Sequence, residues 1–139
     1  MKQLSVFLEN APGHLARMTR LLGEAGHNMY ALMTADTADY GVVRVICDDP
    51  DAAAQTLRDR DITAQVHEVC AVAVPDRPGG LSDLLDTIAE ASIDISYCYC
   101  FVHPSCSDAV TVFRLSDSEA TVVLETAGYR IVELEDFNA

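Results

Sequence analysis

The chain has 139 residues, of which 22 are acidic and 9 are basic, so its net charge at neutral pH is −13. Apolar residues make up 50% of the sequence, which is enough for a packed core. A chain this acidic is repelled by phosphate groups, so the composition argues against binding to nucleic acid or to an anionic membrane surface.

The sequence also argues against a membrane span or an exported protein. No apolar run is long enough to cross a bilayer, and the chain reaches Glu9 before a signal-length apolar region develops. We therefore expect a cytoplasmic protein without a secretory signal. The 5 cysteines are odd in number and would stay reduced in that compartment, so we expect no disulfide framework.

The sequence contains an internal repeat. The segment LSVFLENAPGHLARMTRLLGEAGHNM, which starts at Leu4, is matched by CAVAVPDRPGGLSDLLDTIAEASIDI, which starts at Cys70. The repeated positions include Pro12, Gly13, Leu15, Glu24 and Ala25, which return as Pro78, Gly79, Leu81, Glu90 and Ala91. We expect two domains, residues 1–69 and 70–139, that pack through a shared sheet or interface because each is small.

The first copy predicts strands at residues 4–8, 28–36, 41–47 and 62–69, with a turn over residues 38–41. One helix follows Pro12-Gly13 and ends at Gly26, and a second begins in the Asp-Asp-Pro-Asp segment at residues 48–51. The second copy predicts strands at residues 70–75, 94–103, 108–115 and 130–135 and helices at residues 79–92 and 117–127. This β-α-β-β-α-β order predicts an α+β, ferredoxin-like fold for each copy, with an antiparallel sheet and both helices on one face.

Several families share this fold, and the loop after the first strand distinguishes them. A heavy-metal carrier would need two cysteines in this loop, and neither copy has one there. An RNA-binding member would need a basic surface and strand aromatics, which the charge of −13 and the strand GVVRVIC do not provide. An acyl-phosphate hydrolase would need a cationic cradle in the first loop, but Arg77 offers one cation in one copy and nothing matches it in the other.

The two loops share a polar residue followed by x-Pro-Gly-x-Leu at the start of a helix. The first N–H groups of a helix lack an internal partner and carry the positive end of its dipole, so they can hold a carboxylate. Gly13 and Gly79 have no Cβ, which lets a ligand approach the backbone closely. The pattern thus suits a small ligand that carries a carboxylate.

This motif, present in both copies, resembles that of the ACT domain, the regulatory module of many amino-acid biosynthetic enzymes. The resemblance covers Leu4–Val69 and Cys70–Phe137, and it is to tandem ACT proteins without a fused enzyme. It implies a non-catalytic protein that binds an amino acid where two ACT units meet, with no cofactor. The ligand-binding residues that it implies are Asn10, Ala11, Pro12, Gly13, His14, Leu15, Asn28, Met29 and Tyr30 in the first copy, and Asp76, Arg77, Pro78, Gly79, Gly80, Leu81, Asp94 and Ile95 in the second.

Each of these residues also has an ordinary structural interpretation. Asn10 and Asp76 either cap the following helix or contact a ligand, and Asn28 and Asp94 either turn the chain or contact a ligand. Leu15 and Leu81 are expected in the core. His14 is expected at the surface or at the mouth of the ligand site, and its counterpart is Gly80, so the two loops cannot bind a ligand in the same way.

The cysteines support an alternative function, a metal- or thiol-based sensor or carrier. Cys98, Cys100, His103 and Cys106 supply four soft ligands within one short segment, although at a spacing that zinc sites do not usually have. On a strand, Cys98 and Cys100 would share one face. The sequence contains no catalytic motif.

We expect a homodimer formed through exposed edge strands and a separately encoded metabolic enzyme as a further partner.

Overall fold

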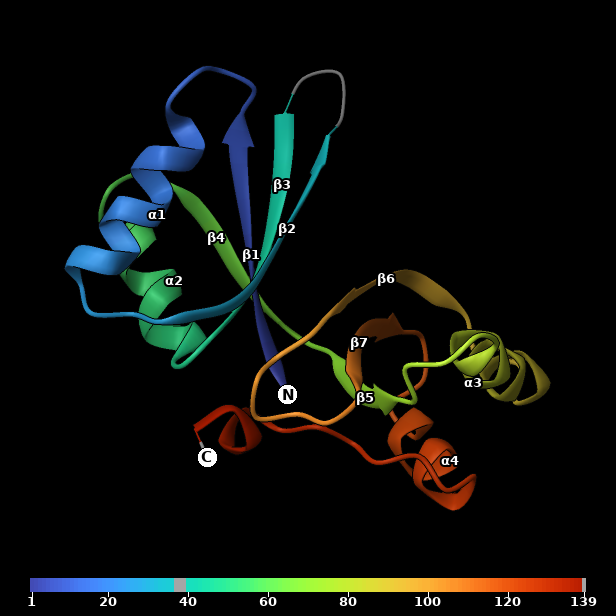
Figure 1. Ribbon diagram of the computed structural model, residues 1–139. Helices are drawn as coiled ribbons and strands as arrows, with labels where there is room; N and C mark the ends of the chain where they lie inside the picture. The colour runs from blue at the N-terminus through green and yellow to red at the C-terminus, as the bar shows by residue number, and fades with distance from the viewer. Residues whose placement is uncertain (37–39, 139) are drawn as a thin grey trace. The chain divides into compact units, whose positions relative to one another are not determined.

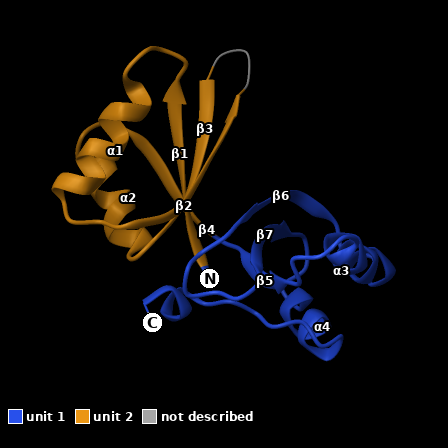
Figure 2. Cartoon of the chain, viewed as in Figure 1, with its two compact units in different colours: residues 1, 68–139 blue, residues 2–67 orange. Residues whose placement is uncertain are grey.

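The computed structural model describes residues 1–36 and 40–138. The chain forms two compact units, residues 2–67 and residues 1 and 68–139 (Figure 2). Each unit has its own sheet and its own apolar core. Residues 38 and 39 of the expected turn lie outside the described residues. Within the described ranges, no helix has both the length and the apolar character that a membrane span requires.

The unit of residues 2–67 has the β-α-β-β-α-β order that the sequence predicts (Figure 1). Its sheet has the strand order β2-β3-β1-β4, and β3 pairs antiparallel with both β1 and β2. The two helices cover one face of this sheet. The elements are β1 (Lys2–Glu9), α1 (His14–Glu24), β2 (Met29–Asp36), β3 (Tyr40–Cys47), α2 (Pro50–Arg58) and β4 (Thr63–Glu68).

The local sequence explains these elements. Alternate residues of β1, Leu4 and Val6, are buried in the core, as the two-residue period of a strand requires. At the start of α2, the Asp49 carboxylate accepts a hydrogen bond from the amide N–H of Ala52 at 3.0 Å, and Pro50 occupies the first helical turn, where it has no N–H to leave unpaired.

Leu15 and Leu81, which were expected in the core, lie at the surface. Their exposed fractions are 39% and 38%. The helical period places both leucines on the inward stripe, but each lies in the first turn of its helix. In α1 the buried apolar side chains begin one turn later, at Met18, and Leu84 is the corresponding residue in the second copy. The prediction of a core role was therefore wrong.

The second unit repeats the first with one strand fewer. Its elements are β5 (Cys70–Val74), α3 (Gly80–Glu90), β6 (Ile95–Phe101), β7 (Ala109–Leu115), α4 (Ala120–Thr126) and a 3₁₀ helix, η1 (Leu134–Asn138). The sheet order is β5-β7-β6, and both pairs are antiparallel. Phe113 of β7 is fully buried in the core that the sheet forms with α3 and α4.

The strand predicted over residues 130–135 is reduced to a single bridge between Val72 and Ile131. Two backbone hydrogen bonds flank this bridge, from the Ala73 amide to the Arg130 carbonyl at 2.9 Å and from the Val132 amide to the Ala71 carbonyl at 2.8 Å. The segment thus lies on the outer side of β5, where a fourth strand would lie, but it does not continue as a strand.

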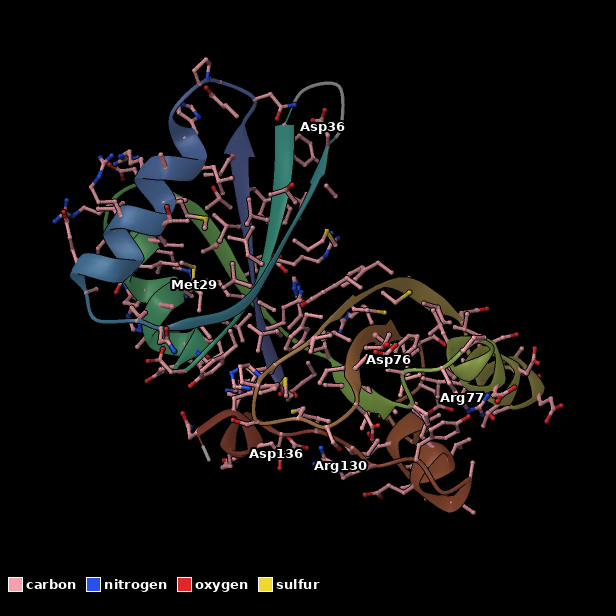
Figure 3. The ribbon with its side chains drawn as sticks, viewed as in Figure 1. Met29, Asp36, Asp76, Arg77, Arg130 and Asp136 are labelled. Carbon is pink, nitrogen blue, oxygen red and sulfur yellow. The ribbon has the colours of Figure 1, made fainter. Side chains whose placement is uncertain are left out.

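Local polar contacts explain why the strand stops. The Asp136 carboxylate accepts a hydrogen bond from the Glu133 amide at 2.9 Å and lies 3.4 Å from the Arg130 guanidinium (Figure 3). Such side-chain bonds to the backbone compete with strand pairing. The resulting turn buries Phe137, whose ring centroid lies 5.7 Å from that of Phe101. Burial of this aromatic side chain stabilises the turn in place of a longer strand.

Candidate functional site

Both Pro-Gly loops place a glycine in the left-handed conformation at the start of a helix. Gly13 precedes α1 with a φ of +86°, and Gly79 precedes α3 with a φ of +85°. Among the residues that the structure describes, no side-chain hydrogen bond caps either helix. The alternative in which Asn10 and Asp76 act as caps is therefore wrong. The His14 amide donates to the Ala11 carbonyl at 3.4 Å, and the Gly80 amide donates to the Arg77 carbonyl at 3.0 Å. Among the described residues, the amides of the next two residues in each helix have no such bond and can hold an anion.

Beside the first of these helix starts lies a cavity of about 420 Å³. This volume falls within the range of small-molecule sites in proteins. The cavity is bounded by the end of β1, the Pro-Gly loop, the start of α1 and the ends of β2 and β3. It is lined by Leu8, Glu9, Asn10, Ala11, Pro12, His14, Leu15, Thr34, Ala35, Asp36, Gly41, Val42 and Val43.

Strand register determines which residues of β2 and β3 reach this cavity. Leu8 of β1 and Asp36 of β2 both pair with Gly41 of β3. Because Gly41 has no side chain, the Asn10 side chain comes close to it: a Cβ placed on Gly41 would lie 3.2 Å from Asn10 Oδ1. Gly41 therefore leaves room at the sheet surface between the Pro-Gly loop and β2.

Two hydrogen bonds fix polar side chains at this cavity. Asn10 Nδ2 donates to Asp36 Oδ1 at 2.5 Å, which ties the Pro-Gly loop to the end of β2. The Nδ1 atom of His14 lies 3.0 Å from the Glu9 carbonyl oxygen, which can only accept, so Nδ1 carries the proton in this bond. His14 also lines a second cavity, of about 370 Å³, together with Arg17 and Ile62.

The corresponding loop of the second unit is more tightly closed. Gly80, the counterpart of His14, is buried, and a Cβ at this position would lie 2.3 Å from the Pro75 carbonyl oxygen. Arg77 extends beside the helix start, where its Nη1 atom would lie 3.7 Å from a Cβ on Gly79 and its Nη2 atom donates to Asp83 at 2.7 Å (Figure 3). The protein's own Arg77 side chain thus lies over this helix start, whereas no atom of the described residues lies within 4 Å of a Cβ on Gly13.

The structure does not bring the other predicted ligand residues to these loops. Asn28 and Met29 lie at the start of β2, and Asp36 lies at its end (Figure 3). Asn28 exchanges hydrogen bonds with Asp48, which follows β3. Asp94 makes the same kind of contact with Ser116, and Tyr30 and Ile95 belong to this end of their strands. Within each unit, these residues are therefore separated from the Pro-Gly loop by the length of a strand.

Sequence reasoning missed the contribution of β2 and β3 to the cavity, above all Asp36 and Gly41. A signal for Asp36 was available. In the predicted fold the first and second strands run in the same direction, so the residue that ends the second strand lies at the same edge of the sheet as the loop that follows the first.

The cysteines and His103 do not form a metal site. Within residues 1–36 and 40–138, no group of three or more His, Cys, Asp or Glu side chains is arranged to hold a metal ion. Cys98 and Cys100 are exposed. The pKa of the Cys98 thiol is nevertheless raised, first by desolvation of its partly covered sulfur and second by the nearby Cys100. A raised pKa disfavours a reactive thiolate. Cys106 is buried, and its amide donates to the His103 carbonyl in a turn. Burial and the nearby Asp48 raise the pKa of Cys47 to about 12.

Comparison with known proteins agrees with the fold of the two units. The family model described as an ACT domain pair matches residues 1–136. The chain belongs to the ACT domain family. Its two units are a pair of ACT domains, and the ACT fold is a regulatory fold. No curated protein matches the sequence.

Solved structures support the same fold. Protein BT0572 from Bacteroides thetaiotaomicron is 32% identical, with a TM-score of 0.88 over 98% of this chain and 94% of that chain. The regulatory subunit of aspartate kinase from Thermus thermophilus is 14% identical, with a TM-score of 0.67 over 91% of this chain and 90% of that one. The corresponding subunit from Thermus flavus is 13% identical, with a TM-score of 0.66 over 91% and 90%. At these last two identities the likeness concerns the fold alone.

The difference between the two ACT loops is open to a direct test with glycine variants. Gly80→Ala should lower the free energy of unfolding by about 1–3 kcal/mol, because the added Cβ would collide with the Pro75 carbonyl. Gly23→Ala is the control: Gly23 lies within α1 with open space around it, so alanine should raise the free energy of unfolding by about 0.5–1 kcal/mol. Urea denaturation measures both, and equal stability of the two variants would contradict the tight second loop.

Proposed function

We propose that this ACT pair is a non-catalytic regulatory protein that binds a free amino acid in the cavity of its first unit. The observation that carries this proposal is the uncapped start of α1 at the wall of a 420 Å³ cavity. The unpaired N–H groups of α1 would receive the ligand carboxylate, and the left-handed Gly13 leaves the approach to them free of a side chain.

The first unit is the better candidate because its helix start is accessible. In the second unit, Arg77 lies over the start of α3 and Gly80 packs against the Pro75 carbonyl. We therefore propose one principal site in each chain, at Asn10 to Leu15, with Asp76 to Leu81 serving mainly to build the second unit. The cytoplasmic pool of amino acids would supply the ligand, and a separately encoded metabolic enzyme would be the regulated partner.

Regulation requires the ligand to bind two states of the protein unequally. The regulatory subunits of aspartate kinase have a similar fold, and the present chain would act on its enzyme in the same general manner. Such an effect would need no catalytic residue in the ACT pair. The ligand would act by stabilising one arrangement of ACT units.

Leu15 and Leu81 provide a matched pair of variants for testing the site. They occupy equivalent helix positions and are equally exposed, but only Leu15 contributes to the described cavity. A thermal-shift screen of the twenty amino acids against the unmodified protein should identify at least one that raises the melting temperature, because a ligand that binds only the folded state adds about 2.7 kcal/mol of stability at a hundred times its Kd.

Leu15→Asn should weaken binding of that amino acid by about tenfold, which corresponds to about 1.4 kcal/mol. Leu81→Asn should leave the affinity unchanged while altering stability by a similar amount. Isothermal titration calorimetry measures both affinities. No melting shift with any of the twenty amino acids at millimolar concentration, or equal loss of affinity in the two variants, would contradict the proposed site.

We extend the proposal to assembly as a homodimer, with the ligand where ACT units of two copies meet. β2 is an outer strand of its sheet, so a strand of a second copy could add to the sheet at its outer edge. Because β2 also contributes Thr34 and Asp36 to the cavity, pairing there would bring the second copy close to the ligand. Sedimentation equilibrium should give the mass of a dimer, and ligand should tighten it; a monomer at micromolar concentration with and without ligand would contradict this part of the proposal.

A further inference from the structure

Asp36 is the acidic side chain that the fold places opposite the Pro-Gly loop of the first unit. It ends β2, pairs across the strands with Gly41, and lines the same cavity as the loop. Its Oδ1 atom accepts the hydrogen bond from Asn10 Nδ2 at 2.5 Å. Within residues 1–36 and 40–138, no hydrogen bond is made to Oδ2, so one oxygen is anchored and the other can accept from a ligand.

The charges at the cavity favour a cationic group near Asp36. Glu9 and Asp36 are the acidic residues of the lining, and both are exposed. The basic side chain of the lining is His14, whose Nδ1 is bonded to the Glu9 carbonyl. A ligand with only a negative charge would meet this acidic rim and the net charge of −13 of the whole chain. A zwitterion offers a carboxylate to α1 and an ammonium group to Asp36.

The remainder of the lining is suited to an aliphatic side chain. Leu8, Leu15 and Val43 present apolar surface from β1, α1 and β3. Burying apolar ligand atoms against these residues removes them from water. The cavity thus offers three kinds of surface to a ligand. These are a helix start for an anion, a carboxylate for a cation and an apolar wall.

We infer that Asp36 is the residue that selects an α-amino acid over the 2-oxo acid and the 2-hydroxy acid of the same carbon skeleton. This inference rests on the proposed function, in which the ligand carboxylate occupies the start of α1. The α-ammonium group of an amino acid donates to Asp36 Oδ2 in a charge-assisted hydrogen bond. A 2-oxo acid has a carbonyl at that position, which only accepts, and it would face the carboxylate with a second acceptor. A 2-hydroxy acid has an uncharged hydroxyl there, whose hydrogen bond to Asp36 lacks the charge that strengthens the ammonium contact.

Such selection has a use in amino-acid metabolism, because 2-oxo acids are the products of transamination and share their carboxylate and side chain with the amino acid. A regulatory site that recognised only those two groups would respond to both compounds. With Asp36, the site responds preferentially to the aminated form. Specificity then comes from an unfavourable contact with the wrong ligand as well as a favourable contact with the right one.

The test is calorimetric titration of the full chain with L-leucine, 4-methyl-2-oxopentanoate and 2-hydroxy-4-methylpentanoate. The unmodified protein should bind leucine at least about tenfold more tightly than either acid. Asp36→Asn keeps an oxygen that can accept from Asn10 but removes the charge, so the preference for leucine should fall to near unity. Asp86→Asn is the control, because it removes the same charge from the exposed surface of α3 in the other unit and should leave the preference unchanged.

The outcomes separate this inference from the proposed function. If none of the twenty amino acids binds the unmodified protein, the proposed function fails and the role of Asp36 fails with it. If an amino acid other than leucine binds, that amino acid and its 2-oxo and 2-hydroxy acids replace the leucine set in the same comparison. If the amino acid binds but the two acids bind equally well, or if Asp36→Asn retains the full preference, the proposed function stands and the role of Asp36 is wrong. Thermal melting of Asp36→Asn checks that the variant is folded.

Discussion

The structure of both ACT units depends on a left-handed glycine at the start of a helix. Gly13 and Gly79 adopt φ values of +86° and +85°, which side chains with a Cβ rarely adopt. A helix that starts in this way has no side-chain cap, and the preceding proline stiffens the chain that leads into it. The conformation therefore leaves polar N–H groups at the protein surface, where capping residues usually satisfy them. In the first unit these groups lie beside a cavity.

Duplication has preserved this constraint while its surroundings have diverged. The residue after the glycine is His14 in one copy and Gly80 in the other, and Gly80 is held so close to the Pro75 carbonyl that a side chain does not fit. Ala11 in the first loop corresponds to Arg77 in the second, where the guanidinium pairs with Asp83 of α3. Two small differences in one loop thus leave one helix start open and cover the other.

The sequence predicted the fold well because repeat, hydrophobic period and Pro-Gly loops all agreed. It failed where a residue's role depends on tertiary contacts. The spacing of Leu15 fits a core stripe, but spacing does not show that buried packing in α1 begins one turn later. The terminal segment has the composition of a strand, but Asp136 bonds to the Glu133 backbone and Phe137 finds a buried position in a turn. The sequence pattern alone does not show whether such contacts or strand pairing are more stable.

The candidate site likewise has a part that the sequence predicted and a part that it did not. The loop residues Asn10 to Leu15 were accessible to sequence reasoning because they form a motif, and the cavity contains all of them except Gly13. Asp36 and Gly41 form no motif, and they meet the loop through the register of β2 and β3. The family resemblance also suggested Asn28 and Asp94, which lie at the far end of their strands from the loops. These residues keep a ligand role only in contact with another ACT unit, which is a proposal.

The central claim is that the open start of α1 holds the carboxylate of an amino acid. Amide chemical-shift mapping by NMR during titration with the amino acid that binds tests it most directly, because each N–H of the loop reports separately. The account predicts that the largest changes fall on the amides of Gly13, His14, Leu15 and Ala16, with much smaller changes at Gly79 to Ser82. Large changes at Gly79 to Ser82 with none at Gly13 to Ala16 would contradict it.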